Sequence, residues 1–333
     1  MTRVLVTGVG GPLGQAIVKA SRRSRLPTRV IGTDRALLSV GFDWVDAGYV
    51  LPDCRHTDQY IAAMIDICQR ERVDLVLPGS EGEIRVLSEY AACISSKAAA
   101  RLIVPPLSVL DVCFDKLETC RFLDKNGLHG PRYAGLGDAD ALVELINDLG
   151  FPLLAKPCRG SGSQGIFLVR SELDLEYIRS LGREYVVQEY LLPDDEEYTV
   201  GVFTDSRGNQ NHGICMRREL AAGNTYRAWV TDHAAVLAEA SRVVEKLRIV
   251  GPCNVQIRVN ARGPIPFEIN PRFSGTTGMR AHFGYNEVEM AIQSFVLNEP
   301  ILPPSLVYGT ALRYWEEVYL PTTDRGFSVS TLF

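Results

Sequence analysis

Apolar and polar residues alternate along the first hundred positions in a way that predicts a parallel α/β unit. Short apolar runs suit buried strands, and the stretches between them repeat apolar residues every three or four positions, as amphipathic helices do. The strands are expected at 3–7, 28–33, 73–78 and 101–105, and the helices at 12–24, 57–71 and 81–94. Strands that alternate with helices predict a small parallel sheet with helices on its faces.

The pattern changes after Pro105 and Pro106. Two helices, at 107–113 and 115–126, lead into a mixed segment around a glycine-serine loop, with strands at 131–134, 151–157, 165–169 and 184–191 and helices at 139–149 and 172–181. Beyond residue 190 strands dominate, at 197–204, 210–218, 226–230, 253–260 and 264–270, with one helix at 233–248. We therefore expect three parts, residues 1–105, 106–188 and 189–333.

The composition is that of a globular protein and excludes several classes. Of the 333 residues 46% are hydrophobic, and the formal net charge of −5 argues against a nucleic-acid partner, which would need a basic face. No run approaches the roughly 18 apolar residues that span a bilayer, and the first strand begins without a signal-peptide pattern, so we expect a cytoplasmic protein with no membrane partner. The eight cysteines form no C-x-x-C pair, which disfavours structural zinc and a disulfide framework.

A glycine-rich turn joins the first strand to the first helix, in the segment VLVTGVGGPLGQAIV at residues 4–18. Its glycines are Gly8, Gly10, Gly11 and Gly14, and Asp34 ends the next strand, about where an acid would hold the ribose of NAD. The turn resembles the T-G-x-x-G-x-x-G signature of the short-chain dehydrogenases. The chain has no Tyr-x-x-x-Lys pair, which such an enzyme needs to lower the pKa of its tyrosine. An NAD(P)-dependent oxidoreductase is therefore an alternative, and the preferred expectation is that the turn binds no dinucleotide.

The last predicted hairpin gathers polar residues that suit a metal and a phosphate. Glu268 and Asn270 are two positions apart on one strand and share a face, and the partner strand can bring Gln256 opposite them. A carboxylate with two amide oxygens suits Mg²⁺, and Arg272 beside them suits a phosphate. Scattered polar residues on a surface hairpin are the alternative.

A second phosphate-binding element lies upstream. Lys156 ends an apolar strand and is followed by CRGSGSQGI, in which Gly160, Gly162 and Gly165 let backbone N–H groups approach a phosphate. The loop lacks the G-x-x-x-x-G-K-[ST] signature of a P-loop, because its cation precedes the glycines.

These motifs resemble the ATP-grasp superfamily, and within it the branch of the carbamoyl-phosphate synthase large subunit and the biotin carboxylases. The most specific piece is FEINPRFSGTTGMRAHFGYNEVE, with the strand lysine, the glycine loop and VVQEYL in the expected order before it. The resemblance implies an α/β and α+β chain: a Rossmann-like parallel domain, a small lid subdomain with the glycine loop, and an antiparallel-sheet ATP-grasp domain.

The resemblance also implies roles for individual residues. The nucleotide phosphates would be held by Lys116 and Lys156 and by the loop residues Gly160, Ser161, Gly162 and Ser163. The adenine would be read at Gln188, Glu189, Tyr190 and Leu191, and the ribose by Glu197, with Glu196 leaving the register open. Two Mg²⁺ ions would be held by Gln256, Glu268 and Asn270, and the transferred phosphoryl group by Arg272. Gln256 departs from the glutamate of many members, so one metal is expected to bind more weakly.

The implied activity is that of a carboxylate-amine ligase acting on amino acids or peptides. ATP would phosphorylate a carboxylate to an acyl phosphate, an amine would capture it, and ADP and phosphate would leave. For the substrate carboxylate the candidates are Arg280, preferred and counted as catalytic with Arg272, and Arg217 or Arg218, each with a structural salt bridge as the alternative. Ser80 and Glu81, after a parallel strand, are candidates for the amine.

Other functions are alternatives to the ligase. A carboxylating or carbamoylating enzyme is the first alternative, although the chain lacks a second synthetase half, a biotinyl carrier and a glutaminase. The oxidoreductase and a non-catalytic ATP-binding regulator are the others. The partners expected are a small-molecule carboxylate and an amine, and a homodimer is the common arrangement in such families.

Overall fold

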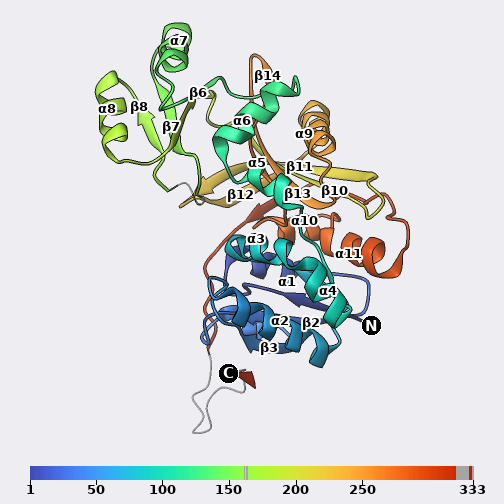
Figure 1. Ribbon diagram of the computed structural model, residues 1–333. Helices are drawn as coiled ribbons and strands as arrows, with labels where there is room; N and C mark the ends of the chain where they lie inside the picture. Colours follow the sequence, from blue (N-terminus) through green and yellow to red (C-terminus); the bar gives the residue numbers. More distant parts are fainter. Residues whose placement is uncertain (161, 163, 320–329, 332–333) are drawn as a thin grey trace.

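A computed structural model describes residues 1–160, 162, 164–319 and 330–331 of the chain (Figure 1). It contains three sheets, one parallel and two antiparallel. Figure 1 shows the parallel sheet at one end of the molecule, the larger antiparallel sheet in the middle, and the smaller one projecting from it with α7 and α8. This arrangement confirms the fold class expected from the sequence.

The parallel sheet has the strand order β16-β3-β2-β1-β4-β5. Its strands are β1 (Thr2–Val6), β2 (Thr28–Asp34), β3 (Ala47–Val50), β4 (Leu75–Leu77), β5 (Arg101–Leu102) and β16 (Ser330–Thr331). The helical segments are α1 (Pro12–Arg22), η1 (Val40–Trp44), α2 (Thr57–Glu71), α3 (Glu81–Glu89) and α4 (Ala91–Ala98). The inner strands β1, β2 and β4 are largely buried on both faces, so their sequences are continuous apolar runs.

The smaller antiparallel sheet has the order β6-β9-β7-β8. It is built from β6 (Tyr133–Gly135), β7 (Leu153–Pro157), β8 (Phe167–Val169) and β9 (Tyr185–Glu189), with α7 (Ala139–Leu149) and α8 (Glu172–Ser180). The helices bury Leu142, Leu145, Leu175 and Ile178 in one core with the sheet. Val186 of β9 faces the other side of the sheet, where it packs in a small cluster with Cys120 and Cys158.

The larger antiparallel sheet has the order β14-β13-β10-β11-β12-β15. Its strands are β10 (Glu197–Thr204), β11 (Gln210–Ala221), β12 (Asn224–Thr231), β13 (Gly251–Asn260), β14 (Gly263–Asn270) and β15 (Thr310–Leu312). Along β10, alternate residues such as Tyr198 and Val200 pack in the core with α9 (Ala234–Leu247). The intervening Glu197 and Thr199 lie on the other face, and Glu197 lines the cavity described below.

One core joins this sheet to the parallel sheet. It combines Val4 and Ile17 of the parallel unit with Phe203 and Met216 of the larger sheet and with Tyr285. Three short helical segments lie between the two sheets, α10 (Thr277–His282), α11 (Glu287–Ala291) and η2 (Ile292–Leu297). None of the three was expected from the sequence, because five or six residues are too few to establish a helical period.

Two further differences from the expected elements concern the segment 81–128. The single helix expected at 81–94 is two helices that meet at Tyr90, whose φ of −100° and ψ of 9° end α3. The helices α5 (Leu107–Cys113) and α6 (Lys116–Lys125) bury Val109 and Leu123 in the core of the larger sheet. Residues 107–128 therefore pack with the larger sheet. The two boundaries expected between the three parts of the chain stay predictions. Among the described residues no helix is both long and apolar enough to cross a membrane.

Candidate nucleotide and metal site

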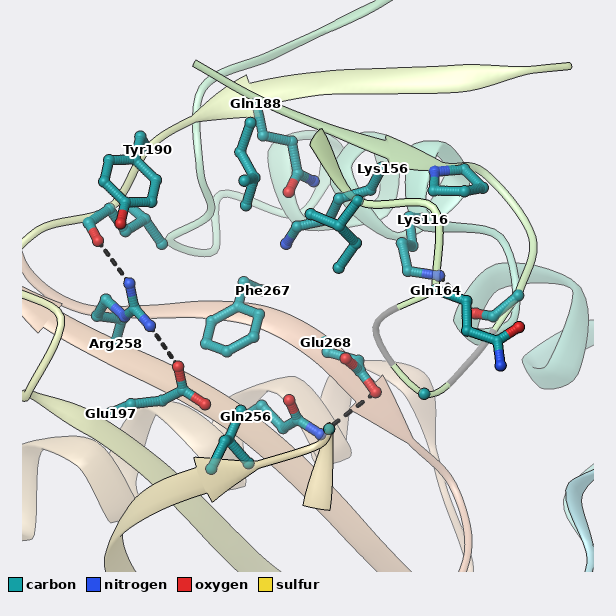
Figure 2. Close-up of a pocket in the computed structure, with 18 of the residues that line it drawn as sticks. Lys116, Lys156, Gln164, Gln188, Tyr190, Glu197, Gln256, Arg258, Phe267 and Glu268 are labelled. Carbon is teal, nitrogen blue, oxygen red and sulfur yellow. Dashed lines mark hydrogen bonds and ion pairs between the residues drawn. The ribbon is translucent and has the colours of Figure 1, made fainter. Parts of the chain in front are cut away.

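A cavity lies where the two antiparallel sheets face each other (Figure 2). Figure 2 shows Lys116, Lys156 and Gln188 on one side of it, Glu197, Gln256 and Glu268 on the opposite side, and the Phe267 ring between them. Of the sequence candidates, the described residues that line it are Lys116, Lys156, Gly160, Gly162, Gln188, Glu189, Tyr190, Leu191, Glu197, Arg218, Gln256 and Glu268. Ser161 and Ser163 lie outside the described residues.

The two lysines reach the cavity from different elements. Lys116 is the first residue of α6, where Asp115 caps the helix by accepting hydrogen bonds from the N–H groups of Leu117 and Glu118. Its Nζ donates to the carbonyl oxygen of Gly160, with 2.7 Å between the atoms. The lysine therefore stands at the base of the glycine loop.

Lys156 lies on β7, an inner strand of the smaller antiparallel sheet, and is almost fully buried. Its Nζ lies 5.0 Å from the centre of the Phe267 ring, in cation-π geometry. Burial lowers the pKa of Lys156, and the carboxylates of Glu268 and Glu197 act in the opposite direction. A buried ammonium with no direct carboxylate partner among the described residues is suited to receive an anion.

The segment expected to bind adenine, residues 188–191, begins with the last two residues of β9. Inside it, the Gln188 amide donates to Sγ of Cys120 at 2.9 Å, and the Tyr190 hydroxyl donates to Asp194. The carbonyl oxygen of Leu191 accepts from Nη1 of Arg258 at 2.7 Å. The segment is thus fixed from both sides while its residues line the cavity.

Of the two candidates for the ribose-binding acid, Glu196 and Glu197, it is Glu197 that lines the cavity. It accepts from Arg218 at 2.7 Å and also pairs with Nη2 of Arg258. Glu196, which left the register open, instead accepts from the Tyr198 hydroxyl at 2.6 Å and does not line the cavity. The ribose-binding role of Glu197 remains a proposal.

The hairpin of β13 and β14 pairs Gln256 directly with Glu268. The next pairing joins Ile257 to Pro266, so Phe267 is the extra residue of a β-bulge. The bulge turns both Phe267 and Glu268 toward the cavity, whereas a regular strand would send them to opposite faces. This is why the aromatic floor of the site was not expected from the sequence.

Glu268 is the carboxylate at the centre of the expected metal site. Its Oε1 accepts from the amide nitrogen of Gln256 at 3.2 Å and from that of Asn270 at 2.9 Å. In the described part of the chain no group of three or more His, Cys, Asp or Glu side chains could hold a metal. A metal here would therefore rest on one carboxylate and on oxygens of the nucleotide, a donor set that Mg²⁺ accepts and that suits a softer metal poorly.

A larger cleft opens from the cavity toward α3 of the parallel unit. It shares Lys116, Gly160 and Glu268 with the cavity and extends to Glu81 and Asn270. Arg272 donates to Oδ1 of Asn270 and to Oε1 of Glu81, each at 3.0 Å. Ser80 is the residue at the N-terminus of α3, directly before Glu81. The cleft therefore leaves room for a further ligand beside Glu268 and Asn270.

The three arginine candidates for the substrate occupy different places. Arg280 is fully buried, donates to Glu287 at 3.0 Å, and lines neither the cavity nor the cleft. Arg217 points away from the cavity and lies over the Trp229 ring. Arg218 lines the nucleotide cavity instead of a separate substrate site. The geometry thus favours the salt-bridge alternative for Arg280, and its role toward the substrate stays a prediction.

Close packing accounts for the glycine turn. A Cβ at Gly14 would lie 2.2 Å from the carbonyl oxygen of Gly8, and one at Gly79 would lie 2.2 Å from that of Thr7. Asp34 accepts from the Gly10 N–H at 2.8 Å, and a Cβ at Gly10 would meet this carboxylate and Ser39. The glycines therefore let α1 sit close against the strand ends, which is a reason for their presence that needs no dinucleotide.

Two cavity residues with defined contacts were missed by sequence reasoning, Arg258 and Phe267. Arg258 could have been found, because it lies two positions after Gln256 on the same strand face. The position of Phe267 could not have been found in this way, because the sequence does not show that a bulge turns its ring toward the cavity.

Comparison with known proteins agrees with this geometry. Residues 182–318 match the family model described as ATP-grasp in the biosynthetic pathway with Ter operon, and residues 4–99 match the PylC-like N-terminal domain. The chain is 25% identical over 325 residues to a formate-dependent phosphoribosylglycinamide formyltransferase of Ignicoccus hospitalis, covering 91% of this chain and 77% of that one. It is 21% identical over 287 residues to the carbamoyl phosphate synthase large chain of Pyrococcus furiosus. That match covers 80% of this chain and only 26% of the synthase, so the chain spans about a quarter of that relative.

Solved structures show the same fold. An ADP complex of N5-carboxyaminoimidazole ribonucleotide synthetase aligns with a TM-score of 0.72 at 18% identity, covering 92% of this chain and 79% of that one. The biotin carboxylase of Campylobacter jejuni, in complex with a β-γ-ATP ligand, aligns with a TM-score of 0.71 at 16% identity, covering 92% and 73%.

The chain has the fold of the ATP-grasp enzymes, and its residues 182–318 match an ATP-grasp family model. Within the superfamily it resembles the branch of the carbamoyl phosphate synthase large chain, the carboxyaminoimidazole ribonucleotide synthetases and the biotin carboxylases. The resemblance seen in the sequence motifs is therefore confirmed.

Proposed function

We propose that the chain binds Mg·ATP and joins a small carboxylate, such as that of an amino acid or peptide, to an amine. The carboxylate attacks the γ-phosphate of ATP, and the bond from that phosphorus to the bridging oxygen breaks, which releases ADP. The amine then attacks the acyl phosphate and displaces inorganic phosphate. The observation that carries the proposal is one cavity in which Lys116 and Lys156 face Glu268, next to the segment 188–191.

The chain's own residues supply positioning and charge. Lys116 and Lys156 would bind phosphate oxygens, because a phosphoryl transfer depends mainly on orientation and charge neutralisation. Arg272, held between Asn270 and Glu81, would orient the transferred group at the entrance of the cleft. Glu268 would hold a magnesium ion, which neutralises phosphate charge when it is bound. The glycine loop would exclude water from the acyl phosphate, which water otherwise hydrolyses.

Carboxylation or formylation is the second candidate. It is supported by the relatives of the branch, since the formyltransferase is by its name formate-dependent and the biotin carboxylase aligns along 92% of this chain. In that reaction bicarbonate or formate would be the phosphorylated carboxylate.

Release of ADP and phosphate from Mg·ATP tests both candidates. The purified chain would be incubated with pairs of amino acids, and separately with bicarbonate or formate plus an amine. Hydroxylamine in the same assay traps an acyl phosphate as a hydroxamate whose mass identifies the carboxylate. Hydroxamate formed from an amino acid supports the ligase, and hydroxamate formed only from formate supports the second candidate. Binding of NADH without any binding of ATP would contradict both.

A further inference from the structure

Gln256 lies between a group that only donates hydrogen bonds and a group that only accepts them. Its Oε1 accepts from Nη2 of Arg218 at 2.7 Å, and its Nε2 donates to Oε1 of Glu268 at 3.2 Å. A guanidinium has no acceptor and an ionised carboxylate has no donor, so the amide has one satisfactory orientation. If the amide were rotated by 180°, its N–H group would face the N–H groups of Arg218 and its oxygen would face the carboxylate of Glu268.

Arg218 is held in place by groups other than Gln256. Its Nε and Nη2 donate to Oε1 of Glu197 at 2.9 and 2.7 Å, and its Nη1 reaches Oγ1 of Thr225 at 3.4 Å. The arginine and glutamate side chains are each only 8% exposed. Swinging the arginine away would leave a buried carboxylate with one fewer partner, which is costly. The contact with Gln256 is therefore a fixed part of the site.

This orientation conflicts with a role for Gln256 as a metal ligand. Magnesium takes oxygen ligands, but Gln256 presents its N–H group toward Glu268 and its oxygen toward Arg218. Asn270 is oriented in the same way, because its Oδ1 accepts from Arg272 and its Nδ2 donates to Glu268. Glu268 thus remains as the carboxylate ligand of the hairpin.

We infer that Arg218 withholds Gln256 from the metal, so that the nucleotide complex of this chain contains one magnesium ion, on Glu268, in place of the two expected from the sequence. The guanidinium lines the same cavity as Glu268. The inference rests on the proposed function, because it concerns the complex with a nucleotide.

Counting bound manganese tests the inference without an activity assay. Mn²⁺ would be titrated into the wild-type chain saturated with the non-hydrolysable analogue AMP-PNP, and free Mn²⁺ would be read from its electron paramagnetic resonance signal. One bound ion per chain is expected for the wild type. Arg218→Met should bind a second ion, and the double variant Arg218→Met with Gln256→Met should return to one.

The outcomes separate the inference from the proposed function. Two ions in the wild-type chain would overturn the inference and leave the proposed function standing, and this result needs no variant to fold. A count of one in a folded Arg218→Met protein would also overturn it, since the amide would then be free to turn. If the wild-type chain shows neither a thermal shift with AMP-PNP nor bound manganese, the proposed function fails and the inference fails with it.

Discussion

Arg272 and Glu81 form an ion pair although 191 residues separate them, with 3.0 Å between Nη2 and Oε1. The pair joins the segment that follows β14 of the larger sheet to the first residue of α3 in the parallel unit. Glu81 lines the cleft, and the arginine side chain is only 12% exposed. The position of the expected phosphoryl-binding arginine therefore depends on a part of the chain that does not line the cavity.

Glu81→Gln should lower turnover and leave nucleotide affinity unchanged. The substitution removes the charge that orients Arg272, and a misplaced catalytic group can cost up to about a hundredfold in rate. Steady-state ADP release would give kcat, and calorimetry with ADP would give Kd. Asp111→Asn, which breaks an ion pair with Arg85 at the rim of the same cleft, is the matched control. An equal loss of kcat in both variants would contradict the role of Glu81.

Mg·ATP should raise the thermal midpoint of the chain, and Lys156→Met should abolish the shift. A ligand at a hundredfold excess over its Kd stabilises the folded state by about 2.7 kcal/mol. The variant replaces the ammonium at the centre of the cavity by an apolar chain of similar length. Lys125→Met, at the exposed end of α6, is the control and should keep the full shift. A shift that survives in Lys156→Met would show that the nucleotide binds elsewhere.

Nucleotide affinity should fall on raising the pH sooner than an ordinary lysine would allow. Burial lowers the pKa of Lys156 below its usual value of 10.5, and the phosphates need the charged form. Affinity is therefore lost as the pH rises through the lowered pKa. Lys156→Arg should keep its affinity across this range, because a guanidinium stays protonated. Titration of ADP affinity against pH in both proteins checks this, and parallel curves would contradict it.

The same pKa shift has the opposite sign for stability. The unfolded chain holds the Lys156 proton up to higher pH than the folded chain does. The free energy of unfolding of the nucleotide-free protein should therefore rise with pH between the lowered pKa and 10.5, as far as this group contributes. Lys156→Met should lack this increment in a series of urea titrations, and an increment of equal size in the variant would exclude Lys156 as its source.

Arg280→Met should destabilise the fold by about 3–5 kcal/mol, because it leaves the fully buried Glu287 without its ion-pair partner. Burial already raises the pKa of Glu287, and Arg280 opposes that rise. Adding Glu287→Leu to Arg280→Met should recover much of the loss, which urea denaturation would measure. A folded single variant of unchanged stability with weakened substrate binding would restore the substrate role that the geometry disfavours.

Regular elements of this chain were predictable because their packing repeats with a fixed period. The predicted helix at 57–71 and strand at 197–204 coincide with α2 and β10, since each shows one unbroken pattern of buried residues. The pairing of Gln256 with Glu268 also follows from the hairpin pattern, because residues opposite each other share a face.

Irregular features carried no such signal. The bulge at Phe267 breaks the period of two at the very position where the aromatic ring enters the cavity. The position of Arg280 depends on the packing of α10 against α1, which lies some 260 residues earlier in the sequence. The residues next to Arg280 in the sequence therefore do not show that its side chain is buried. The orientation of Gln256 follows from Arg218 on another strand, and no motif records it.

Arg258 connects three points along the chain, the carbonyl of Leu191 and the carboxylates of Asp194 and Glu197. The end of the cavity proposed to bind adenine and ribose is thereby held together by the chain's own contacts. At Gly160 and Gly162 of the loop, by contrast, a Cβ would have no atom of the described residues within 4 Å, apart from the chain neighbours of each glycine. Ordering a site costs conformational entropy only where it is not already ordered. A nucleoside without phosphates should therefore meet a ready-made half-site, and the entropy of binding ATP should be lost mainly at its phosphate end.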